Sequence, residues 1–200
     1  MVTLENPNNV TGNAQIKGNA RVTEKAIIKG NALVDDDARV TGNACVDGNA
    51  IIYGKAAVNG NAVVTGSALV YGNAQVTENA QVSGNAHVGG NAYVYESCRI
   101  YGETRVTGHV SGCAKVHEYA QILDTACVTA YASVYGNARV TGKAMICGNA
   151  EVSGNAVIGG DAFVTGKARI GGDAEILGGI WDGSEGEILK GRWLAPGVSA

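Results

Sequence analysis

The chain has 200 residues, with 15 Lys and Arg, 18 Asp and Glu and a net charge of −3 at pH 7. The two signs are interspersed without a basic stripe, which argues against a nucleic-acid-binding protein. No apolar run approaches the roughly 20 residues that a membrane-spanning helix needs, and no secretory leader is visible. The five cysteines form no CxxC pair, so we expect reduced thiols, no metal site and a cytoplasmic protein.

One six-residue phrase, Val-x-Gly-Asn-Ala-x, recurs along almost the whole chain. Every sixth residue is Val or Ile from Val10 to Val106, and the series resumes at Val110 and ends at Ile176. A fixed internal period is the mark of a repeat architecture. The sequence therefore predicts a parallel β-solenoid over residues 1–177, followed by a tail over residues 178–200.

Within each unit, the Val or Ile and the Ala four residues later are predicted to point inward. β-Branched residues suit a buried strand, and side chains alternate between its two faces. Gly-Asn tolerates left-handed backbone angles, so this pair belongs at a corner. Three units close a triangle, which predicts a single-stranded solenoid of about ten coils stacked at about 4.8 Å.

In each unit an aliphatic residue is followed by a small residue four positions later. This repeating pattern resembles that of the hexapeptide-repeat family of left-handed parallel β-helices. The resemblance covers residues 4 to about 180 and implies an all-β, left-handed triangular solenoid. Many members are acyltransferases that use acetyl-CoA or acyl-CoA, usually as trimers with a catalytic His near the subunit interface. The GNA form looks closer to uncharacterised bacterial and phage-associated members, which are often labelled as transferases. Because a fold does not define an activity, the function stays open.

Outward side chains one coil apart, eighteen residues in sequence, are expected to stack in columns, and several columns are apolar. Exposed apolar stripes usually mark a partner surface, although β-propensity on an exposed sheet is the alternative. We predict an interface, because the apolar residues gather in columns. Its residues are Ile27 and Val63 on one side, Leu33, Ile51, Leu69, Tyr53 and Tyr71 on the next, and Cys127, Met145 and Phe163 on the third.

The largest break in the repeat is at residues 106–110, where one unit shrinks to four residues. All three histidines of the chain lie around this break. Column spacing falls to sixteen residues across the shortened coil, which places cationic and aromatic side chains together. The predicted ligand-binding residues are Arg99, Tyr101, Lys115, His117 and Tyr135.

This column could hold an anionic ligand, or offer His117 as a general base with Tyr101 and His109 as further catalytic candidates. The alternative is a tolerated deletion with aromatic stacking on an exposed sheet. The repeat places no carboxylate beside His117 to orient it. The chain also lacks the projecting loop or C-terminal helix that the resembled enzymes usually add around acyl-CoA.

The two ends of the solenoid differ. An open end exposes unpaired backbone groups, which favours contact with another chain, and only three residues precede Leu4 at the first inward position. The tail is predicted to cap the last coil through Trp181, Trp193 and Leu194, with docking of a partner as the alternative.

The sequence therefore predicts a structural or protein-interaction module: a self-associating β-helical rod that displays binding columns and needs no cofactor. We expect a homo-oligomer, either a trimer or an end-to-end dimer, with room for a protein partner. The alternative is an acyltransferase that uses acetyl-CoA or acyl-CoA, with an active site between subunits near His117 or His109. A surface-mimicking inhibitor is a third interpretation, without a sequence signature of its own.

Overall fold

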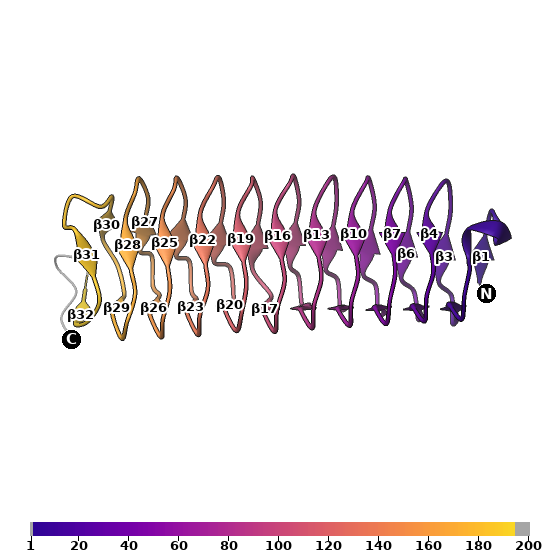
Figure 1. Cartoon of the computed structure of the whole chain (residues 1–200), viewed down its shortest axis with the longest axis horizontal. Coiled ribbons are helices and arrows are strands. Elements are labelled where there is room, and N and C mark those ends of the chain that lie inside the picture. Colours follow the sequence, from indigo (N-terminus) through magenta and orange to yellow (C-terminus); the bar gives the residue numbers. More distant parts are fainter. Residues whose placement is uncertain (1, 195–200) are drawn as a thin grey trace.

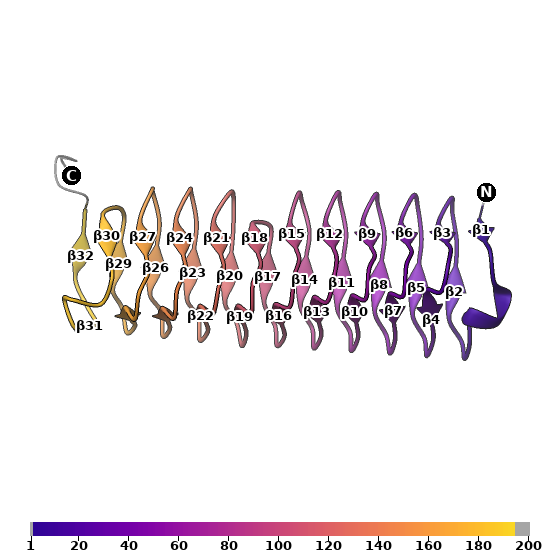
Figure 2. The same cartoon turned by 90° about the horizontal axis from the view of Figure 1, so that it is seen from above.

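The computed structural model describes residues 2–194, which form one straight rod of stacked coils (Figures 1 and 2). Within this range the strands lie in three parallel sheets of 11, 10 and 11 strands, and each strand has two residues. The rod has about 11 turns of 18 residues. The predicted all-β triangular solenoid is confirmed, with about one coil more than the sequence indicated.

From the second coil onward each sheet takes one strand from every coil, so its members are three strands apart in the chain. The first coil has no strand in the second sheet, so β1 and β3 are only two apart. The first sheet contains β1 (Thr3–Leu4), β3 (Arg21–Val22), β6 (Arg39–Val40), β9 (Ala57–Val58), β12 (Gln75–Val76), β15 (Tyr93–Val94), β18 (His109–Val110), β21 (Cys127–Val128), β24 (Met145–Ile146), β27 (Phe163–Val164) and β30 (Ile180–Trp181). The second contains β4 (Ile27–Ile28), β7 (Cys45–Val46), β10 (Val63–Val64), β13 (Gln81–Val82), β16 (Arg99–Ile100), β19 (Lys115–Val116), β22 (Ser133–Val134), β25 (Glu151–Val152), β28 (Arg169–Ile170) and β31 (Glu187–Ile188). The third contains β2 (Gln15–Ile16), β5 (Leu33–Val34), β8 (Ile51–Ile52), β11 (Leu69–Val70), β14 (His87–Val88), β17 (Arg105–Val106), β20 (Gln121–Ile122), β23 (Arg139–Val140), β26 (Val157–Ile158), β29 (Glu175–Ile176) and β32 (Arg192–Trp193).

The inward positions of the repeat fill the interior of the rod. From Ala20 to Ile176 the Val, Ile and Ala side chains at the inward positions are at most 2% exposed. Each aliphatic residue pairs with its counterpart in the next coil, as Val34 does with Ile52 and Ile52 with Val70. The core is therefore a continuous column of branched side chains that contact one another from coil to coil.

The corners explain why Gly and Asn occupy the same two slots in so many units. Gly42 has a φ of 72°, and an added Cβ would lie 2.8 Å from the Gly60 carbonyl oxygen of the next coil. Only glycine adopts this backbone conformation without strain. The neighbouring Asn side chains form ladders along the rod, in which Asn13 Nδ2 donates to Asn31 Oδ1 at 3.1 Å and Asn31 Nδ2 donates to Asn49 Oδ1 at 3.0 Å.

Some corners carry an acidic residue in the left-handed conformation instead of glycine. Asp36 has a φ of 57°, and its Oδ2 accepts a hydrogen bond from the Gly54 N–H at 3.0 Å. Glu78 Oε2 likewise accepts from the Glu96 N–H at 3.1 Å. These charge-assisted bonds to the next coil offset the backbone strain. The six-residue phrase by itself does not predict them.

The unit at residues 106–110 makes a tighter corner, visible as the low arch between β17 and β18 in Figure 2. The backbone N–H groups of Thr107 and Gly108 both donate to the Ile122 carbonyl, at 2.8 and 3.2 Å. A side chain at Gly108 would collide with the Ala126 carbonyl. Hydrogen-bonded neighbours are 16 residues apart across this corner instead of 18, as predicted.

The first coil, at the N-terminal end of the rod, is less buried than the coils that follow it. The 3-10 helix η1 (Pro7–Asn9) forms one corner of the first coil, at the rim of this end (Figure 1). The inward side chains of the first coil are only partly buried, in contrast to those of the next coil. They are Leu4, Val10, Ala14 and Ile16.

The tail continues the solenoid. Trp181, Ile188 and Trp193 occupy the inward register, paired with Val164, Ile170 and Ile176. The two indoles meet edge to face with ring centroids 5.5 Å apart, and Trp193 remains 44% exposed. The tail therefore winds a further coil, and capping by Trp181, Trp193 and Leu194 stays a prediction; residues 195–200 lie outside the described part of the chain.

The described residues contain no helix with the length and hydrophobicity needed to cross a bilayer.

Candidate functional site

The predicted aromatic column lies on the second sheet, where β16, β19 and β22 pair in order. Tyr101, His117 and Tyr135 each follow one of these strands. Their rings are stacked, with centroids 4.9 Å apart between Tyr101 and His117 and 5.1 Å apart between His117 and Tyr135, and interplanar angles of 2° and 1°. Arg99 and Lys115 are paired directly in the adjacent column. The structure thus brings the five predicted ligand-binding residues together.

A carboxylate lies beside His117, contrary to the expectation that the repeat places none there. Glu118 has a φ of 61°, and its Oε1 lies 3.6 Å from His117 Nδ1. Its Oε2 accepts a hydrogen bond from the Gly136 N–H at 2.9 Å, which holds the carboxylate in place. The interaction depends on the side-chain direction at a left-handed corner, so the pattern of inward and outward positions does not reveal it.

Burial between the two tyrosines lowers the pKa of His117, the nearby Glu118 raises it, and Lys115 lowers it further. The net direction is downward, so the imidazole is neutral at neutral pH. A neutral imidazole can accept a proton or a hydrogen bond. The column is therefore able to bind a polar group or act as a base.

We expect the imidazole of His117 to titrate below the value of an unfolded-chain histidine, about 6.5. Because the unfolded chain then binds more protons, the contribution of His117 to stability is complete above about pH 6.5 and declines as the pH falls toward the folded pKa. NMR titration of the ring, together with unfolding measurements against pH, tests this. The His117→Phe variant keeps an aromatic ring in the stack but has no imidazole to protonate. Its stability should therefore fall less at acid pH than that of wild type, by the contribution of His117. A measured pKa of 6.5 or higher would contradict the expectation.

The other histidines lie on different faces. His109 is in the first sheet, paired with Tyr93 and Cys127, and His87 is in the third sheet. Neighbours in sequence around the shortened coil are therefore distributed around the rod. His109 is not brought together with His117 and Tyr101, which separates it from the other catalytic candidates.

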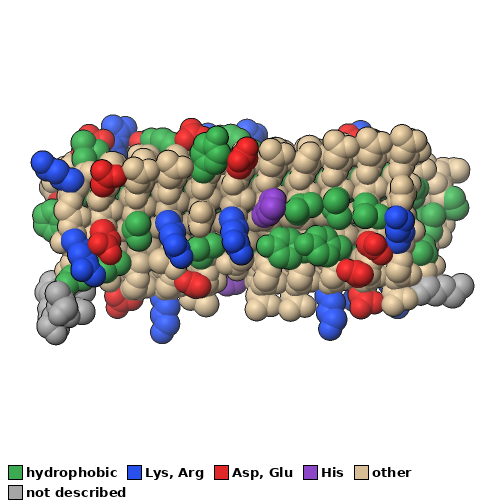
Figure 3. Space-filling model, turned by 90° about the horizontal axis from the view of Figure 1, so that it is seen from below, with side chains coloured by type: hydrophobic (Ala, Val, Ile, Leu, Met, Phe, Trp, Pro, Cys, Tyr) green, Lys and Arg blue, Asp and Glu red, His purple; other side chains and the backbone are tan. Residues whose placement is uncertain are grey.

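The predicted apolar columns are formed, on three separate sheets. On the third sheet Leu33, Ile51 and Leu69 pair in a row, and Tyr53 stacks on Tyr71 with centroids 5.4 Å apart. Figure 3 shows apolar side chains gathered on one face of the N-terminal half of the rod. The remaining predicted interface residues are in the second sheet, namely Ile27, at 42% exposed, and Val63, and in the first sheet, namely Cys127, Met145, at 41% exposed, and Phe163.

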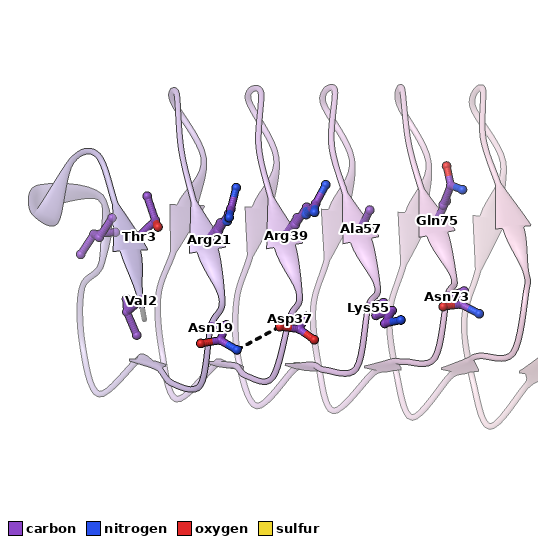
Figure 4. Close-up of a pocket in the computed structure, with 11 residues that line it drawn as sticks. Val2, Thr3, Asn19, Arg21, Asp37, Arg39, Lys55, Ala57, Asn73 and Gln75 are labelled. Atoms are coloured by element: carbon purple, nitrogen blue, oxygen red, sulfur yellow. Dashed lines mark hydrogen bonds between the residues drawn. The ribbon is translucent and has the colours of Figure 1, made fainter.

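A groove that the repeat did not point to lies over the first sheet near the N-terminal end (Figure 4). Its volume is about 1190 Å³, and it runs along the rod from β1 to β12. Arg21, Arg39 and Lys55 give it a positive lining, with Asp37 as its one acidic residue. The eighteen-residue spacing between Arg21 and Arg39 was the available signal in the sequence. A second cavity of about 330 Å³ lies on the last coil, and its lining includes Trp181, Ile188 and Trp193. Neither of these two cavities includes His117.

Comparison with known proteins supports the architecture. A family model described as "YdcK Beta solenoid repeat" matches residues 132–148. No curated protein matches the chain. The chain is a parallel β-solenoid repeat protein.

Proposed function

We propose that the chain is a structural or protein-interaction module, a stiff rod that associates with itself through its N-terminal end. The partial burial of the first coil carries this proposal. Ile16 of β2 and Leu4 of β1 point inward but are only partly buried, whereas Ala20 and Ile28 of the next coil are 0% exposed. An unpaired sheet edge with exposed aliphatic side chains is a ready surface for a second chain.

The geometry favours an end-to-end dimer over a side-by-side trimer. Strands β1 and β2 of the first coil are edge strands of the first and third sheets, and Val10 of the same coil bridges to Ile28 of the second sheet. The apolar columns of the sides are narrower, and their half-buried residues already contact neighbours in their own columns. Pairing of sheet edges would bury both the backbone groups and the side chains of the first coil.

We expect sedimentation velocity at micromolar concentration to show a dimer or larger assembly, and Ile16→Lys to shift it to a monomer. The charge would have to be buried without a partner in the joined ends. Gln15→Lys, which adds the same charge to the outward residue of the same strand, is the matched control and should still associate. Equal thermal unfolding of the two variants would show that the first coil remains folded. A wild-type chain that is monomeric throughout would refute the proposal.

A second candidate function is a hexapeptide-repeat acyltransferase that uses acetyl-CoA or acyl-CoA. The observation that favours it is the neutral imidazole of His117 with the Glu118 carboxylate 3.6 Å from its Nδ1, an arrangement suited to a general base. Calorimetry with acetyl-CoA distinguishes the two functions. Binding that is lost in His117→Ala and kept in His87→Ala would favour the transferase over the structural module.

A further inference from the structure

Two arginines are paired on adjacent strands of the first sheet, and no carboxylate of the described chain neutralises their charges. Arg21 of β3 pairs directly with Arg39 of β6, and like charges at directly paired positions destabilise a sheet. Among residues 2–194, neither guanidinium has a carboxylate within ion-pair distance. Arg169, in contrast, lies 3.6 Å from Glu151 in the neighbouring coil. The Arg21–Arg39 pair therefore carries a repulsion that the described chain does not compensate.

Both side chains lie in the groove of about 1190 Å³ over the first sheet. Figure 4 shows them extending in the same direction from adjacent strands, whereas Lys55 lies one coil further along, in the row of corner residues that includes Asp37 and Asn73. Asp37, the acidic residue of the lining, accepts a hydrogen bond from Asn19 Nδ2 at 3.1 Å, so this carboxylate is held at the corner. Three cations against one carboxylate give the groove a local charge of +2, whereas the whole chain carries −3.

We infer that this groove binds the phosphoryl group of a small phosphate monoester. Neighbouring strands are about 4.8 Å apart, so two guanidinium forks on paired residues can each donate two N–H bonds to one tetrahedral oxyanion. The ammonium group of Lys55 adds a third positive charge. A dianionic phosphate thus relieves the repulsion between the arginines.

The rest of the groove indicates what carries the phosphate. Beyond Arg39 the floor is the small side chain of Ala57, which leaves room for a ligand, and the amides of Asn73 and Gln75 follow along the rod. Amides donate and accept hydrogen bonds, as a hydroxylated molecule requires. The groove lining contains no aromatic ring on which a nucleobase could stack. A sugar phosphate therefore fits better than a nucleotide.

Isothermal titration calorimetry with glucose 6-phosphate, inorganic phosphate, glucose and glucuronate on the full chain tests the inference. We expect glucose 6-phosphate to bind, inorganic phosphate to bind more weakly, and glucose and glucuronate to give no measurable heat. Affinity should fall as salt concentration rises. Inorganic phosphate that binds as tightly as the ester, or glucuronate that binds as tightly as glucose 6-phosphate, would overturn the assignment of a phosphate monoester.

The decisive variant is Arg21→Gln combined with Arg39→Gln, which should weaken glucose 6-phosphate binding at least about tenfold, as expected when charge-assisted hydrogen bonds are lost. Without ligand this variant should unfold at the same or a higher temperature than wild type, because a repulsion is removed. The control Arg105→Gln with Arg139→Gln makes the same charge change on the third sheet and should bind as wild type does. Equal weakening in both variants, or no binding of phosphate esters by wild type, would overturn the inference.

Discussion

Replacement of Ile52 by Ala is expected to destabilise the rod by about 2–5 kcal/mol, the usual loss when a buried Ile is truncated. Ile52 is 0% exposed and stacks between Val34 and Val70 in the third sheet. Truncation would leave a cavity in the middle of the core column, because the backbone of the coils on either side is held by the sheet ladders. Urea-induced unfolding followed by circular dichroism measures the loss.

The adjacent residue provides a matched control. Ile51 belongs to the same strand, β8, but points outward and is half-buried. The same truncation at this position should cost about 1 kcal/mol or less, as is usual for surface positions. Equal losses at the two positions, or a larger loss at Ile51, would contradict the assigned direction of every side chain in the repeat, since a shift by one residue exchanges the two faces.

The second large effect is expected at a corner. Gly84 has a φ of 69°, and an added Cβ would lie 2.7 Å from the Gly102 nitrogen. Gly84→Ala should therefore lower the free energy of unfolding by at least about 1–2 kcal/mol, the cost of a left-handed conformation for a residue with a Cβ. The change is measured in the same urea experiment.

The reverse substitution at another corner supplies the comparison. Ala130 already adopts a left-handed conformation, with a φ of 59°. Ala130→Gly removes the strain, although it also increases the freedom of the unfolded chain, so the variant should be as stable as wild type or more so. A neutral Gly84→Ala would show that these corners relax, and the role assigned to the corner glycines would then be wrong.

The sequence predicts the core of this protein well, because burial repeats with a strict period. Val34, Ile52 and Val70 could be placed in one inward column from spacing alone, and the same arithmetic placed His117 between Tyr101 and Tyr135 across the shortened coil. Each of these results depends only on backbone register. Register in a parallel solenoid follows from the number of residues per coil.

Features that depend on side-chain direction were not predictable in this way. The carboxylate of Glu118 reaches His117 and Gly136 only because its corner is left-handed, and Arg21 and Arg39 form a groove lining only because both extend the same way. The extra coil at Trp181 was missed for another reason. The spacing of the inward residues becomes irregular in the tail, so the six-residue pattern no longer marks them.

These surfaces divide the rod into regions with separate roles. The open first coil is the proposed site of self-association, and the Arg21–Arg39 groove beside it is the proposed phosphate site. The column around His117 lies about halfway along the rod. All three depend on the same stacking of coils, and the column around His117 depends most strongly on the shortened corner.

Nuclear Overhauser contacts of the His117 ring test that stacking most directly. The structure predicts cross-peaks from the His117 ring protons to the rings of both Tyr101 and Tyr135, whose centroids lie 4.9 and 5.1 Å away. A uniform coil of 18 residues would instead place Tyr119 beside Tyr101. Contacts between Tyr101 and Tyr119, with none from His117 to Tyr101, would contradict the register on which the fold and its surface columns depend.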